Sequence, residues 1–201
     1  ADVAGANFTR SAASFSEQVQ SILASHKDWI TSNGAKGTRA NLDGQDLSHI
    51  DLKGVNLGGA SLKGAKLTGA KLAEAMLVMA DFGTADLQHA DLSGATMDGA
   101  NLRGCNMAGA KLDLARIGSV DIKGPDGKPT GRKWPANLTG VILQQASLKG
   151  AVMRDANLTG ADLRGADLTD AVLIDANLHG ADLEEAITTG ATLPLIDEDD
   201  D

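Results

Sequence analysis

From Ala40 onward, large apolar residues recur at every fifth position of the chain. Each unit has a small residue, usually Ala, then most often Asp, Asn or Lys, then Leu or a similar residue, and finally two mostly small or polar residues. The central apolar residues form two runs, from Leu42 to Ile122 and from Leu138 to Leu183. A period of five matches neither a helix nor a strand, so no single regular element would place all of them on one side.

A square coil explains this period. If each unit forms one side, its central residue and the small residue two positions earlier point to the axis, and the other three positions face solvent. Four units then close one turn, and successive turns stack through backbone hydrogen bonds at about 4.8 Å. We therefore predict an all-β solenoid of about seven coils, roughly 30 Å long. The many glycines two positions after a centre would occupy the corners.

The tandem pattern A-(D/N)-L-x-x resembles the pentapeptide-repeat family between Ala40 and Leu193. This resemblance implies a right-handed quadrilateral β-helix. The family includes the Qnr and MfpA type proteins, acidic rods that resemble the DNA duplex and bind gyrase, and also secreted effectors, regulators and domains fused to other modules. The resemblance therefore predicts an architecture and leaves the activity open.

Interruptions of the pattern divide the chain into six expected segments. A strap with two stray units at 1–13 precedes a capping helix at 14–34, repeat runs at 38–122 and 136–195 flank a projecting loop at 123–135, and an acidic, disordered tail occupies 196–201. The stray units and the first residue, Ala1, favour a domain taken from a longer chain.

Helical spacing appears only before the repeats. Ser14 and Glu17 have the spacing of a capping box, and Asn33-Gly34 would end the helix. The apolar residues at helical spacing are Phe15, Val19, Ile22, Leu23, His26, Trp29 and Ile30. We expect a helix over about 15–32 that covers the open first coil and prevents end-to-end growth. A dimerisation or partner-binding helix is the alternative.

The interruption at 123–135 is rich in Pro and Gly and carries Lys123, Lys128, Arg132 and Lys133 on a chain of net charge −9. Because Trp134 lies beside these cations, Lys128, Arg132, Lys133 and Trp134 are candidate contacts for a protein partner. The alternative is a tolerated surface insertion in which Trp134 covers exposed coil edges.

Two outward apolar clusters are the other candidate interface. They consist of Met76, Val78 and Met79, and of Val152, Val172 and Ile174. Either the chain covers them itself, through Phe8 for the first and through Leu195 and Ile196 for the second, or they form a side-by-side homodimer.

Because the chain is acidic, we consider an alternative function, the regulation of a topoisomerase by DNA mimicry. Five of the acids lie in the tail, and lysines interleave with the rest, so a continuous row of phosphate-like charge is not expected. One acidic stretch remains, formed by Asp162, Asp167, Asp182, Glu184 and Glu185. The acidic balance and the few aromatic residues also argue against direct nucleic-acid binding.

The sequence predicts no catalytic, cofactor or metal site. His49 and His89 fall two coils apart, too far to share a metal ion, and His26 and His179 are remote. Cys105, the single cysteine, occupies an inward small-residue position. No apolar run is long enough to span a membrane. We therefore expect a cytoplasmic, non-enzymatic scaffold or protein-interaction module with an unidentified partner.

Overall fold

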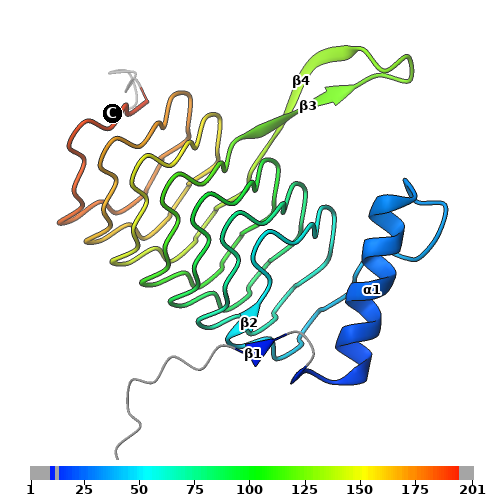
Figure 1. Cartoon of the computed structure of the whole chain (residues 1–201). Coiled ribbons are helices and arrows are strands. Elements are labelled where there is room, and N and C mark those ends of the chain that lie inside the picture. The colour runs from blue at the N-terminus through cyan, green and yellow to red at the C-terminus, as the bar shows by residue number, and fades with distance from the viewer. Residues whose placement is uncertain (1–9, 12–13, 195–201) are drawn as a thin grey trace, which may run out of the picture.

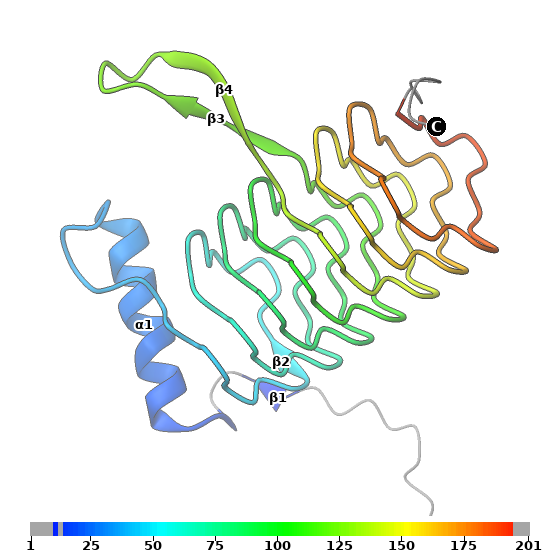
Figure 2. The ribbon, with the colours of Figure 1, turned by 180° about the vertical axis from the view of Figure 1, so that it is seen from behind.

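The computed structural model describes residues 10–11 and 14–194. Stacked coils form a rod with helix α1 (Glu17–Thr31) at one end and a two-stranded hairpin projecting from its middle (Figure 1). The hairpin comprises β3 (Ser119–Lys123) and β4 (Pro129–Pro135). Short strand β1 (Arg10–Ser11) pairs in parallel with β2 (Ile50–Asp51), which is part of the first coil. Viewed from behind, the hairpin points away from the rod and α1 lies beside the first coil (Figure 2).

The coils stack through parallel backbone bridges, as the five-residue period predicts. Along one side the bridges join Asn41, Ser61, Asp81, Asn101, Asn137, Asn157 and Asn177 in succession. At each step the central residue donates to the next coil, as in the 2.7 Å bond from Leu62 N to Asp81 O. The small residue two positions earlier accepts the return bond, as in the 2.9 Å bond from Asp81 N to Ala60 O. These bonds satisfy the backbone of a structure that has almost no long strands.

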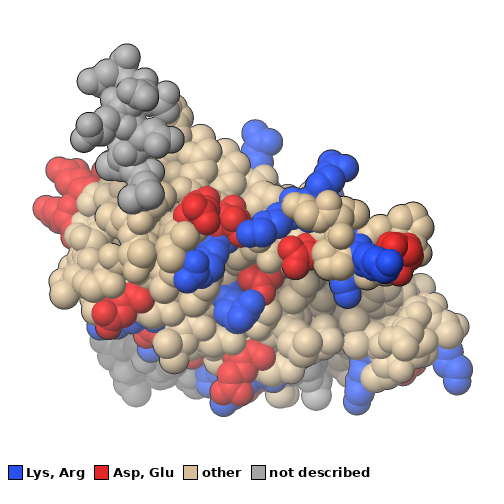
Figure 3. All heavy atoms as spheres, turned by 90° about the horizontal axis from the view of Figure 1, so that it is seen from above, with Lys and Arg blue, Asp and Glu red and all other residues tan. Residues whose placement is uncertain are grey.

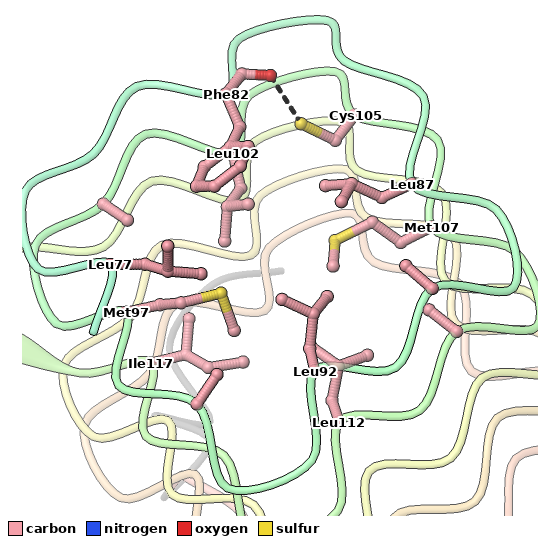
Figure 4. Close-up of a cluster of buried hydrophobic side chains, with 14 of the residues drawn as sticks. Leu77, Phe82, Leu87, Leu92, Met97, Leu102, Cys105, Met107, Leu112 and Ile117 are labelled. Atoms are coloured by element: carbon pink, nitrogen blue, oxygen red, sulfur yellow. Dashed lines mark hydrogen bonds between the residues drawn. The ribbon is translucent and has the colours of Figure 1, made fainter. Parts of the chain in front are cut away.

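The interior is filled by the central residues of the units. Leu77, Phe82, Leu87 and Leu92 form one layer, and Met97, Leu102, Met107 and Leu112 form the layer on top of it (Figure 4). All of these side chains are fully buried. Cys105 points into the same interior, where its Sγ donates to Phe82 O at 2.9 Å.

The acidic or amide residue before each centre has a local structural role. Its side-chain oxygen accepts a hydrogen bond from the backbone N–H two residues later, as in Asp91 to Ser93 (3.0 Å) and Asn157 to Thr159 (3.1 Å). Asp and Asn favour this turn because their short side chains reach their own backbone. Many acids of the repeat are therefore turn residues.

Helix α1 starts later than the capping box suggested. Its N-cap is Ser16, whose hydroxyl accepts from Val19 N at 3.3 Å, whereas Ser14 bonds back to Ser11 O. An N-cap oxygen must lie three residues before the N–H it accepts from, and Ser16 meets that condition for Val19. At the other end, Gly34 has a positive φ and its N–H bonds to Trp29 O, as expected for a C-terminal cap.

The interruption is a β-hairpin that starts at Ser119, so the expected boundary at 122/123 lies inside it. The coil runs directly from Gly118 to Ala136, joined by a 2.9 Å bond from Ala136 N to Gly118 O. The hairpin thus replaces one corner residue. Val120 and Ile122 resemble a repeat unit in sequence, yet both lie in β3 and neither is fully buried.

Candidate interaction surface at the hairpin root

Asp155 anchors the hairpin to the rod. One of its carboxylate oxygens accepts from Ser119 Oγ at 2.7 Å and from Lys133 Nζ at 2.8 Å, so a single side chain holds both strands. The bond from Lys133, followed by that from Ser119, lowers the pKa of Asp155, and the same pairing raises the pKa of Lys133. Lys133, which the sequence suggested as a partner contact, is therefore paired within the chain, although its side chain remains exposed.

The opposite side of the hairpin root is apolar. Val120 and Trp134 are cross-strand neighbours, and both lie over Gly99 together with Met79. A Cβ on Gly99 would lie 2.7 Å from Met79 Sδ and 3.0 Å from a Val120 methyl, so only glycine allows this close approach. A depression of about 360 Å³ lies here, between Met79 and Trp134, with Asp81 and Arg103 also lining it. We call it the Trp134 notch.

Large apolar side chains remain exposed around this notch. Trp134 is 54% exposed, Met79 45% and Met76 51%. Val78 is half-buried. Exposed aromatic and methionine side chains in a fixed frame are typical of protein interfaces.

The structure brings both predicted lateral clusters onto one side of the rod. The bridge series that contains Met76 continues through Thr96, Arg116, Val152 and Val172. The second cluster is half-buried, and the 3.3 Å ion pair between Arg116 and Asp98 lies between the two. The expected covering residues Phe8, Leu195 and Ile196 lie outside the described residues.

The remaining predicted contacts lie on the hairpin. Lys128 makes a long ion pair of 3.9 Å with Asp126, and Arg132 makes no ion pair among the described residues. Strand β4 is exposed along its whole length. Viewed from above, cationic side chains alternate with acidic ones, so this surface has no field of a single sign (Figure 3).

The acidic stretch of the last coils is partly neutralised. Arg164 forms a 2.7 Å pair with Asp162 and holds its pKa well below the ordinary range, and Lys149 pairs with Asp167 at 3.1 Å. No group of acidic, histidine or cysteine side chains in the described residues could hold a metal ion. No helix among them is long and apolar enough to cross a membrane.

Sequence analysis missed the anchor Asp155 and the contribution of Ser119 and Val120. In the sequence Asp155 looks like an ordinary corner residue. Its role becomes visible only from the hydrogen bond that it accepts from Ser119, 36 residues away in the chain. One local signal was present, the alternation of Val120, Asp121 and Ile122, which is typical of a strand.

Comparison with solved structures gives several pentapeptide-repeat proteins. A trypsin-treated variant of QnrB1, a plasmid-mediated fluoroquinolone resistance protein, is 21% identical, covers 73% of this chain and 87% of its own, and has a TM-score of 0.45. HetL, involved in heterocyst differentiation regulation in the cyanobacterium Nostoc sp. strain PCC 7120, is 28% identical, with coverage of 76% and 84% and a TM-score of 0.24. A thylakoid lumen protein from Arabidopsis thaliana is 22% identical, with coverage of 73% and 72% and a TM-score of 0.33.

No curated protein sequence matches the chain. The family model for pentapeptide repeats matches in 8 copies, at residues 38–73, 50–87, 80–118, 136–170 and 153–190. These matches include most of both repeat runs and leave out the hairpin. The family match, together with the parallel bridges and the filled interior, indicates a right-handed β-helix. One helix precedes it at the N-terminal end. The chain belongs to the pentapeptide-repeat family.

Proposed function

We propose that this protein is a non-enzymatic scaffold, a rod of about seven coils that binds another protein through the Trp134 notch and the adjacent face. The exposed pair of Trp134 and Met79 over Gly99 carries this proposal. An apolar side chain of a partner would enter the notch, and Arg132 and Arg103 would supply polar contacts at its rim. Large aromatic residues near the centre of an interface contribute most of its binding free energy.

A rigid frame supports this function. Trp134 is fixed by the Asp155 anchor at the hairpin root and by stacked coils beneath, so docking would cost little conformational entropy. The buried central residues fill the axis, which supports a role without catalysis or cofactor. The buried thiol of Cys105 is compatible with the cytoplasmic location expected from the sequence.

The alternative, topoisomerase regulation by DNA mimicry, has less support. A DNA mimic needs uninterrupted negative charge at the spacing of phosphates. Here Arg164 and Lys149 pair with acids of the last coils, and many other acids accept local turn hydrogen bonds. We likewise infer no direct binding of nucleic acid, because the cations of the hairpin are few and interspersed with acids.

A partner screen at defined positions tests the proposal. A photoreactive phenylalanine analogue replaces Met76, which is exposed on the lateral face that also carries Met79, and an equivalent probe replaces Lys66, which is exposed on another side of the rod. We expect a specific crosslinked protein from Met76 only, and its loss when Trp134→Ala is added. Equal crosslinking from both positions, or crosslinking that survives Trp134→Ala, would contradict the assignment.

Self-association is tested separately by light scattering behind a sizing column. A monomer leaves the exposed methionines available to a different protein. A dimer that Met79→Asp converts to a monomer would instead make this face a homodimer interface. In that case the proposal of a different partner at the notch fails.

A further inference from the structure

A second hollow lies at the N-terminal end of the rod, between α1 and the first coil. It has a volume of about 480 Å³. One wall is α1, with Leu23, Ala24, Lys27, Ile30 and Thr31, and the other is the coil segment with Leu52, Gly54, Val55, Asn56 and Leu57. We call it the cap groove. Its size and mainly apolar lining are typical of binding sites.

An open backbone edge runs along the cap groove. In later coils the residue equivalent to Asn56 makes two bonds to the preceding coil, one as donor and one as acceptor. Met76 N donates to Val55 O, and Met76 O accepts from Leu57 N. The backbone N–H and C=O of Asn56 itself have no partner on the N-terminal side among the described residues. A strand edge with a free donor and acceptor can accept another extended segment.

Two other parts of this coil are already in contact with N-terminal elements. The N–H of Ala40 bonds to His26 of α1 at 3.0 Å, and β1 pairs in parallel with β2 at Ile50 and Asp51. Strand β1 shows that the edge accepts an extended segment one side away from Asn56. The cap groove therefore continues an existing strand-pairing edge.

The apolar side chains that line the cap groove are also only partly buried. Val55 occupies an inward position, yet it is only half-buried, whereas the equivalent Ala75 is fully buried by the coil on each side. Leu23 and Ile30 of α1 are also half-buried. These side chains would be covered by an apolar residue placed beneath Leu57.

We propose that the cap groove binds an extended peptide segment of another protein by parallel strand addition at Asn56. The segment has the pattern small-x-large apolar. The C=O of its small residue accepts from Asn56 N, the N–H of its large residue donates to Asn56 O, and the large side chain packs among Val55, Leu57 and Ile30. This arrangement repeats the bonds that join Val55 and Leu57 to Met76 in the next coil.

This site is distinct from the Trp134 notch, and either can fail without the other. The probe is the blocked peptide acetyl-Ala-Asn-Leu-Thr-Gly-amide, which has the sequence of residues 136–140 of this chain. Amide NMR spectra are recorded at millimolar peptide, with hydrogen exchange in parallel. We expect shifts at Val55, Asn56 and Ile30, and at least threefold slower exchange of the Asn56 amide.

Two variants of α1 locate the effect. Ala24→Phe places a ring in the cap groove from an exposed helix position, and Gln18→Phe adds the same ring at an exposed position that does not line the groove. The shifts should disappear in the first variant and persist in the second. Unchanged spectra outside α1 and the first coil show that both variants remain folded.

Three results would overturn the proposal. They are the absence of a concentration-dependent shift at Asn56, equal shifts with a peptide whose Leu is replaced by Asp, and equal shifts with N-acetyl-leucine amide alone. The last result would assign the cap groove to small apolar molecules, because a single blocked residue cannot reproduce strand pairing over the whole segment.

Discussion

The Nδ1 atom of His26 accepts a hydrogen bond of 3.0 Å from the backbone N–H of Ala40, where the repeats begin. The imidazole is 1% exposed and stacks on Trp29 at a centroid distance of 5.6 Å. An Nδ1 atom that accepts a hydrogen bond must be unprotonated, so the bond requires neutral histidine. The join between α1 and the first coil is therefore sensitive to protonation.

Acidification should weaken this join. Burial, with a smaller contribution from Arg39, lowers the pKa of His26 below its ordinary value of 6.5. The unfolded chain then binds more protons between the two pKa values, so stability is present above the unfolded pKa and decreases as pH falls below it. Urea midpoints at pH 7.5 and 5.5 should differ in this direction.

The matched variant for this experiment is His26→Gln. It should be less stable at pH 7.5, because the bond to Ala40 is altered, but should change less between the two pH values, because the titrating group at position 26 is gone. The other three histidines are retained in both proteins. An equal pH response in both proteins would mean that His26 does not set it.

Gly99→Ala should loosen the hairpin root. Both Gly99 and Gly160 have positive φ, so alanine at either position costs about 1–2 kcal/mol of stability through backbone strain. Only at Gly99 would the new Cβ press on Met79 and Val120, since nothing lies within 4 Å at Gly160. The indole N–H signal of Trp134 should move in Gly99→Ala and stay unchanged in Gly160→Ala.

Asp155→Asn should release the base of the hairpin without unfolding the rod. The variant loses the charge that holds Lys133, and amide exchange in β3 and β4 should become faster. Asp175→Asn is the control, because Asp175 is exposed and acts on Lys133 only through charge. Because the pKa of Asp155 is lowered in the folded state, its contribution to stability is fully present above the ordinary pKa of 3.8 and is lost as pH falls through the lower pKa of the folded state.

Replacement of residues 119–135 by a single glycine should give an uninterrupted solenoid. The coil already closes from Gly118 to Ala136, so one corner residue restores the five-residue spacing. Circular dichroism and the urea midpoint should show a fold at least as stable as the parent, because loop-closure entropy is reduced. A large loss of stability would show that the hairpin supports the coils.

Cys105 should tolerate a smaller residue better than a larger one. Cys105→Ala introduces the residue found at most of the equivalent inward small-residue positions, whereas Cys105→Leu overpacks a filled interior and should cost about 1–3 kcal/mol. Burial raises the pKa of the thiol to about 12, so in the parent protein thiol reagents should react only after unfolding. Fast labelling of the native protein would contradict this burial.

The repeats could be predicted from the sequence because the residues that determine the conformation of each unit lie within that unit. The small residue and the central apolar residue define the inward side, and Asp or Asn makes the local turn, as Asp91 does with Ser93. Prediction was wrong where a local pattern has two solutions. Val120-Asp121-Ile122 fits both a repeat unit and a strand, and its pairing with residues after 128 selects the strand.

The interaction surfaces depended on distances that no local pattern contains. Trp134, Met79 and Gly99 come from three separate places in the chain and meet because the hairpin leaves the rod at one corner, where its root lies over Gly99 of the preceding coil. The cap groove likewise depends on how α1 packs against the first coil. The sequence by itself determined the coil, since short-range periodicity specifies inward and outward positions. Only the tertiary structure decided which outward side chains share a surface, because that depends on the stacking of distant units and on the packing of the two elements that leave the repeat.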